Sequence, residues 1–139
     1  MATVISGGCL CGAVRFEIDE PLGVAGYCHC GRCQRRTGTA ASAQALVAPG
    51  SLRIVSGDDH ICSYDPADGF SKLFCRTCGT ALFARPPGQP DVASVRLGAI
   101  DGDPGVRPSY RQFTAYAAAW EEIPDDGLRR FPERRPAAG

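Results

Sequence analysis

The chain has 139 residues with 15 basic and 15 acidic side chains, so its formal net charge is zero. This length predicts one domain, and the neutral charge disfavours nucleic-acid or anionic-membrane binding, because no overall positive field attracts phosphates. The longest apolar run, residues 115–120, is too short to span a membrane. The N-terminal residues lack the basic and apolar regions of a secretory signal, so we expect a cytoplasmic protein whose thiols are reduced.

Short strands separated by turn-forming residues follow one another along the chain. Apolar and charged residues alternate over 14–18, which is typical of a half-buried strand. A turn of helix is expected after Gly31, ending at Gly38. Further strands are expected over 43–47, 52–55, 61–64, 71–75, 81–84, 92–97 and 111–116, with a short irregular helix near 117–120. We therefore predict an all-β fold, with one domain over residues 1–131 and a frayed C-terminal tail over residues 132–139.

Eight cysteines are the most informative feature, since so many thiols in a small chain indicate disulfides, a metal or redox chemistry. Seven of them fall into three closely spaced groups: Cys9 and Cys11; Cys28, Cys30 and Cys33; Cys75 and Cys78. Disulfides between such close neighbours would be strained or would close only tiny loops. The last pair also lacks the strand-then-helix context of a redox motif. Cysteines two positions apart on a strand, or three apart around a turn, can instead bring their thiolates to one zinc ion without strain. The glycine after Cys78 permits a positive φ, so that backbone N–H groups of the turn can point at the thiolates.

The number of ligands in each group predicts two different zinc sites. Cys9, Cys11, Cys75 and Cys78 make a closed four-thiolate set, which is the structural type. The remaining group, Cys28, Cys30 and Cys33, supplies three ligands, which is the pattern of a catalytic and more labile zinc. We therefore predict one structural Zn²⁺ and one catalytic Zn²⁺, the latter accepting water or a substrate sulfur.

Three other side chains could in principle supply a fourth ligand to the second zinc. Cys62 has no partner at ligand spacing, so a small buried residue on a strand is the favoured interpretation. His29 lies between two ligands on a strand, so its ring should point away from the metal. His60 follows two aspartates in a turn and is expected to be solvated.

Basic side chains gather beside the second cysteine group. Arg32, Arg35 and Arg36 lie within or just after it, and no acidic residue occurs between Cys28 and Gly57. This cluster is either a solvated loop that offsets the thiolate charge or a set of guanidinium groups that binds the carboxylates of an acidic thiol. Both interpretations stay open from the residues alone.

Four segments of the chain carry a resemblance to known proteins: GGCLCGAVRF (7–16), CHCGRCQRRTG (28–38), FCRTCGTALF (74–83) and LGAIDG (97–102). Together they resemble the glutathione-dependent formaldehyde-activating enzyme family, a group of zinc-binding carbon–sulfur lyases that includes centromere protein V-like chains. The resemblance implies a β-tent (Mss-like) fold, a structural zinc on Cys9, Cys11, Cys75 and Cys78, and a second zinc on Cys28, Cys30 and Cys33 that faces the substrate thiol. It also implies that glutathione and formaldehyde are joined to S-(hydroxymethyl)glutathione, or that the reverse C–S cleavage occurs.

The residues that would hold a small acidic thiol such as glutathione are less evident. Arg35, Arg36, Tyr110 and Trp120 are the candidates for the wall of a substrate pocket, although tyrosine and tryptophan more often serve in packing. Two other functions are compatible with the sequence. One is a non-catalytic zinc-stapled module that binds a partner through the tail with Arg134 and Arg135. The other is a reductase that would use Cys62 as a metal-free thiol.

Overall fold

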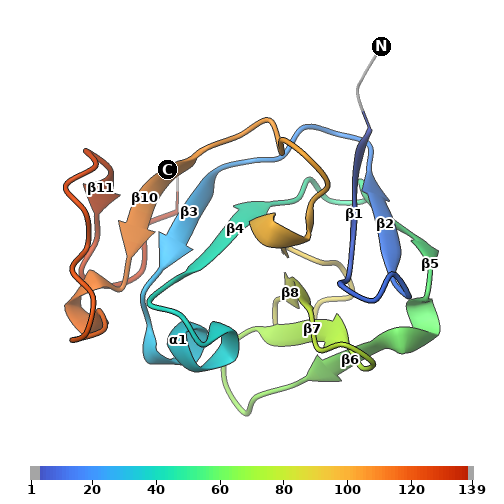
Figure 1. Ribbon diagram of the computed structural model, residues 1–139, viewed down its shortest axis with the longest axis horizontal. Coiled ribbons are helices and arrows are strands. Elements are labelled where there is room, and N and C mark those ends of the chain that lie inside the picture. Colours follow the sequence, from blue (N-terminus) through green and yellow to red (C-terminus); the bar gives the residue numbers. More distant parts are fainter. Residues whose placement is uncertain (1–3, 138–139) are drawn as a thin grey trace.

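A computed structural model describes residues 4–137, and the chain forms two β-sheets in this range (Figure 1). The strands are β1 (Ile5–Gly8), β2 (Arg15–Ile18), β3 (Ala25–Cys28), β4 (Ser42–Leu46), β5 (Leu52–Ser56), β6 (Ile61–Tyr64), β7 (Ser71–Cys75), β8 (Ala81–Arg85), β9 (Ser94–Arg96), β10 (Pro108–Gln112) and β11 (Arg129–Arg130). Helix α1 spans Gly31–Thr37, and single turns of 3-10 helix span Asp58–His60, Leu97–Ala99 and Thr114–Tyr116. No helix in this part of the chain is long and apolar enough to cross a membrane.

The sheets have three and eight strands. The smaller has the order β1-β2-β5, and the larger has the order β11-β10-β3-β4-β9-β8-β7-β6. In Figure 1 the larger sheet curves from β11 and β10 at the left to β6 and β7 at the bottom, while β1, β2 and β5 stand at the right. All named pairs are antiparallel except β10 with β3 and β10 with β11, which are parallel. The all-β prediction is therefore confirmed, with one sheet mixed.

The core fills the space between the two sheets. Phe16 from β2 and Phe83 from β8 are almost completely buried, and their rings meet edge to face with centroids 5.0 Å apart. Ile18 and Val95 are also fully buried, so alternate residues of β2 face this core together with Val95 of β9. The alternation predicted for residues 14–18 thus has the expected physical cause.

Three strands without an alternating apolar pattern were not predicted, namely β1, β3 and the two-residue β11. In β3 the reason is Gly26, on which the ring of Tyr110 lies so closely that a Cβ atom would come within 2.3 Å of it. A glycine inside a strand often marks such a close approach, but its sequence signal resembles a turn. The strand expected over 111–116 ends at Gln112, and the chain then enters a 3-10 turn through Phe113, whose φ is 57°. The short helix expected near 117–120 is not formed.

The end of the chain also differs from the expected frayed tail in its described part, residues 132–137. Phe113 N donates to Glu133 O at 2.9 Å, and Arg135 N donates to Gln112 Oε1 at 2.9 Å. Polar composition predicted fraying, but these backbone and amide groups find partners beside β10. Residues 138–139 of the predicted tail and 1–3 of the predicted domain lie outside the described residues.

Candidate metal centres and substrate cavity

Four cysteines from two distant parts of the chain meet at one point. Cys9 and Cys11 follow β1, whereas Cys75 ends β7 and Cys78 lies in the turn before β8. The Sγ atoms of Cys9 and Cys11 are 3.6 Å apart, and those of Cys11 and Cys75 are 3.8 Å apart although 64 positions separate them in the sequence. All four sulfurs lie within 4.8 Å of one another. The structure thus brings together the four residues of the predicted closed site.

This four-cysteine cluster fits zinc. Sulfurs around a tetrahedral zinc lie about 3.8 Å apart, as the measured separations do. Val14 N donates to Cys9 Sγ at 3.2 Å, which favours a thiolate there. Hydrogen bonds from the Thr80 hydroxyl and backbone lower the pKa of Cys78 to about 5. Gly79 has φ of 79°, the left-handed conformation expected for the glycine after Cys78.

Three further cysteines meet where β3 passes into α1. Cys28 is the last residue of β3, Cys30 is the N-cap of α1, and Cys33 lies in the first turn of the helix. Their sulfurs also lie within 4.8 Å of one another. Hydrogen bonds from the Cys28 and Cys30 thiols lower the pKa of Cys33, which favours a thiolate in this group. The donor set supplies three of the four ligands that zinc takes, and it fits a zinc ion that accepts one more ligand.

None of the three side chains weighed as a fourth ligand belongs to this three-cysteine cluster. Cys62 is half-buried on β6 and joins neither cluster. His60 lies beside Asp59, with Nδ1 3.1 Å from the carboxylate, and is 32% exposed rather than fully solvated. His29 is 3% exposed, and its ring contacts Arg111 instead of the sulfurs.

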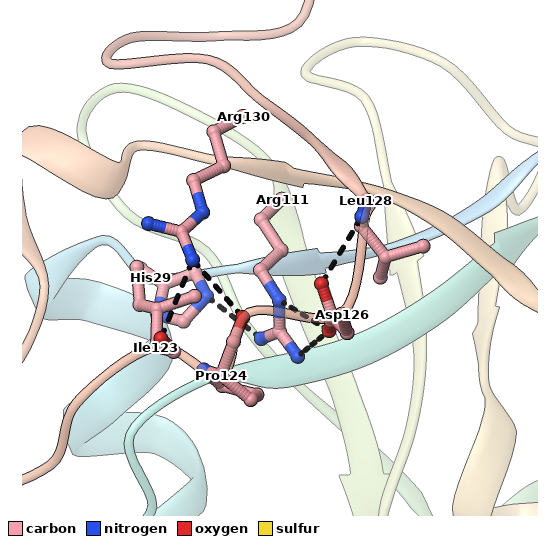
Figure 2. Close-up of polar contacts among 7 residues, drawn as sticks. All are labelled: His29, Arg111, Ile123, Pro124, Asp126, Leu128 and Arg130. Atoms are coloured by element: carbon pink, nitrogen blue, oxygen red, sulfur yellow. Dashed lines mark hydrogen bonds and ion pairs between the residues drawn. The ribbon is translucent and has the colours of Figure 1, made fainter.

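His29, which lies between Cys28 and Cys30 in the sequence, forms a polar network with Arg111 and its neighbours (Figure 2). Arg111 Nη1 lies 3.2 Å from His29 Nε2, while its Nη2 and Nε donate to Asp126 Oδ2 at 2.8 and 3.2 Å. A guanidinium only donates hydrogen bonds, so His29 Nε2 accepts here and the ring proton sits on Nδ1. Burial and the neighbouring Arg111 charge lower the pKa of His29, which keeps the ring neutral.

The network fixes the backbone that carries two of the three sulfurs. His29 N donates to Gln112 O at 3.0 Å, and Gln34 Nε2 donates to His29 O at 2.8 Å. The Arg111 guanidinium also stacks on the Tyr27 ring, 4.2 Å from its centroid. His29, between Cys28 and Cys30, is therefore held in place by hydrogen bonds of its backbone to β10 and α1 and by the contact of its ring with Arg111.

A cavity of about 790 Å³ opens beside the three-cysteine cluster, and all three cysteines line it. Its wall is unusually basic. The cationic side chains that line it are Arg32, Lys72, Arg96, Arg134 and Arg135. Asp68 is the one acidic residue among the lining residues, and it pairs with Arg32 Nη2 at 2.7 Å. The other four cations form no ion pair with a carboxylate within residues 4–137. At most three cysteine thiolates oppose these four cations at the cavity, so positive charge is in excess there.

One of the four residues predicted for the substrate pocket lines this cavity, namely Tyr110. Arg35 is exposed on α1 outside it, and Trp120 is 68% exposed and also outside it. Arg36 packs its guanidinium over the Phe74 ring, 4.9 Å from the centroid, and does not reach the cavity. Helical geometry explains this outcome, because α1 turns its successive side chains in different directions.

Two basic residues that line the cavity, Lys72 and Arg96, were not predicted because they come from strands that are distant from the cysteine group in sequence. Lys72 lies on β7 and Arg96 on β9, where single charged residues in a strand pattern normally indicate the solvent face. Arg96 Nη1 donates to Gln44 Oε1 at 2.8 Å, which orients the guanidinium beside the cavity. No spacing rule along the sequence joins these residues to the cysteines.

Comparison with known proteins finds a matching family model, similar curated proteins and similar solved structures. Residues 4–116 match the model of a family described as glutathione-dependent formaldehyde-activating enzyme. A Halomonas elongata protein, provisionally named a glutathione-dependent formaldehyde-activating enzyme, is 30% identical over 106 residues, which cover 72% of this chain and 68% of that protein. The crystal structure of a Rhodobacter sphaeroides protein superposes with a TM-score of 0.56 at 28% identity, covering 91% of this chain and 98% of the other.

Proposed function

Since this chain belongs to the glutathione-dependent formaldehyde-activating enzyme family, we propose that it is a zinc-dependent carbon–sulfur lyase acting on a thiol–aldehyde adduct. S-(hydroxymethyl)glutathione, formed from glutathione and formaldehyde, is the adduct that the family suggests. In the forward direction the thiol sulfur forms a bond to the aldehyde carbon, and the thiol proton ends on the aldehyde oxygen. Cleavage reverses both changes.

The observation that carries this proposal is the position of the three-cysteine cluster at a basic cavity. Cys28, Cys30 and Cys33 would hold a catalytic zinc, and Cys9, Cys11, Cys75 and Cys78 a structural one. When bound, the catalytic zinc supplies positive charge that favours the thiolate form of a thiol at neutral pH.

The chain's own cations would bind the rest of the substrate. Lys72 and Arg96 line the cavity without acidic partners among the described residues, which suits a thiol that carries carboxylates. Tyr110, buried on Gly26, adds a rigid wall. Holding thiol and aldehyde together converts a bimolecular step into an effectively unimolecular one. Reduced cysteines and glutathione both belong to the cytosol, so we place the reaction in that compartment.

The test compares rates of adduct formation and cleavage with matched cysteine variants. Exchange between ¹³C-formaldehyde and its glutathione adduct is followed by NMR, with and without the zinc-loaded protein. We expect the protein to accelerate the exchange, Cys30→Ser to abolish the acceleration, and Cys62→Ser to retain it, since Cys62 belongs to neither cluster. A protein that holds two zinc ions yet leaves the exchange rate unchanged would contradict the proposal and favour a binding module.

A further inference from the structure

The C-terminal segment, residues 132–137, lies along the substrate cavity. Glu133 accepts from two directions, with its carbonyl bound to Phe113 N and its carboxylate to Tyr116 Oη, both at 2.9 Å. Arg135 N donates to Gln112 Oε1 at 2.9 Å. These contacts fasten the segment to the end of β10 and the following turn. Arg134, Arg135 and Ala137 line the cavity as a result.

The two arginines of this segment are oriented by aromatic rings from different parts of the large sheet. The Arg135 guanidinium lies 4.8 Å from the centroid of the Tyr110 ring, on β10. The Arg134 guanidinium lies 5.8 Å from the Phe70 ring, which precedes β7. Strand β10 is second and β7 seventh in the sheet order, so the segment bridges two arms of the curved sheet. Stacking on a ring limits the rotation of a guanidinium while leaving its N–H groups free to donate.

These two arginines lack carboxylate partners among the residues that the structure describes. Within residues 4–137, neither Arg134 nor Arg135 pairs with an acidic side chain, and Asp68 is already engaged by Arg32. Arg135 Nη1 donates to Pro136 O at 3.2 Å, which leaves its Nε and Nη2 without a recorded partner among the described residues. A planar guanidinium with two such donors matches a carboxylate in a two-point hydrogen bond. Two such groups at one cavity suit a ligand that has two carboxylates, as glutathione does.

We propose that Arg134 and Arg135 are specificity-determining residues that bind the carboxylates of an anionic thiol, and that the C-terminal segment thereby forms one wall of the thiol site. This inference rests on the proposed function for the identity of the reaction. Both arginines lie beyond residues 4–116, the stretch that matches the family model.

The catalytic experiment compares two thiols, glutathione and the uncharged 2-mercaptoethanol, in adduct formation with formaldehyde. Hydrogen bonds to a charged group contribute enough that their loss weakens binding about tenfold or more. We therefore expect the double variant Arg134→Gln/Arg135→Gln to lower the ratio of kcat/KM for glutathione over 2-mercaptoethanol at least about tenfold, mainly through KM. Arg134→Lys/Arg135→Lys should restore part of the ratio because the charge is kept. An unchanged ratio, or an equal loss with both thiols, would overturn the inference.

A binding experiment separates failure of this inference from failure of the proposed function. Calorimetry with S-methylglutathione, which has both carboxylates but no thiol, reports on the carboxylate contacts even if no catalysis occurs. The wild-type protein should bind it at least about tenfold more tightly than the double glutamine variant. Arg129→Gln is the matched control, because that guanidinium stacks on Phe131 outside the cavity and should leave binding unchanged. Equal affinity of the wild type and the double variant, or no binding to either, would overturn the inference. Circular dichroism verifies that each variant is folded.

Discussion

Replacing Arg111 by methionine should destabilise the chain and loosen the three-cysteine cluster. Methionine keeps much of the side-chain volume but removes every N–H donor. Asp126 then loses its ion pair, and His29 Nε2 loses its only hydrogen bond recorded within residues 4–137 (Figure 2). Arg111 itself is 8% exposed, so water does not reach these groups freely.

The magnitude follows from the burial of the guanidinium. His29 Nε2 is buried, and leaving it without its donor costs about 1–3 kcal/mol. Asp126 is an exposed residue that regains water, so the loss of its ion pair adds little. A loss of about 2 kcal/mol corresponds to a fall in Tm of roughly 5–8 °C for a chain of this size.

Thermal unfolding of the zinc-loaded protein measures this fall, with Arg107→Met as the control. Arg107 pairs with Asp103 at 2.8 Å, but its side chain is 72% exposed, and exposed pairs add little to stability. Its Tm should stay close to the wild-type value. The rate of zinc release to a chelator gives a second measurement. The kinetic phase that the wild type shows and Cys33→Ser lacks is assigned to the three-cysteine cluster. That phase should accelerate about tenfold or more in Arg111→Met, as expected when residues that orient metal ligands are lost. Equal Tm shifts in the two arginine variants, with unchanged zinc release, would refute the reasoning.

Three further predictions address the other cluster, the cavity wall and acid sensitivity. Cys11→Ser should lower the zinc content, measured by mass spectrometry under native conditions, from two ions to one and also lower Tm, whereas Cys62→Ser should retain two ions. Gly26→Ala should push the Tyr110 ring out of its place and raise KM for glutathione in the NMR assay, whereas Gly98→Ala, whose added methyl would meet no atom within 4 Å, should leave KM as it is. The Arg111 guanidinium lowers the pKa of Asp126 below its unfolded value, so this pair stabilises the fold above about pH 4 and the contribution is lost as pH falls further. Asp126→Asn should therefore flatten the acidic limb of a plot of Tm against pH, and an unaltered limb would contradict this assignment.

The cysteine clusters were predictable because metal ligation imposes short-range rules on sequence. Cys28, Cys30 and Cys33 lie within six positions, and the local geometry of a strand end and one helical turn brings their sulfurs together. The same reasoning joined Cys11 to Cys75 by ligand number alone, and the structure places them in contact. Such patterns can be recognised in a sequence because each closely spaced group already supplies two or three ligands of one metal site.

The cavity wall could not be predicted in the same way. Arg96 and Arg134 reach the cavity only because the large sheet curves and the C-terminal segment returns along β10. The parallel pairing of β10 with β3 joins residues about 80 positions apart and has no local signal. Arg36, by contrast, is close to the cysteines in sequence, yet it packs against Phe74. Closeness in sequence to the cysteines therefore did not predict which basic residues line the cavity, because strand pairing brings residues from distant parts of the chain to it.

The order of the two ligand sets along the chain has a consequence for biosynthesis. Every cysteine of both clusters lies within the first 78 residues, whereas the cavity is completed by β10 and the C-terminal segment. Because a protein emerges from the ribosome N-terminus first, the thiolates can capture metal before the strand that covers His29 has been made. Strand β10 then adds beside β3, and Arg134 and Arg135 complete the cavity wall after both cysteine clusters have been made. Truncation near residue 131 would accordingly leave every cysteine of both clusters in place and remove these two arginines from the cavity wall.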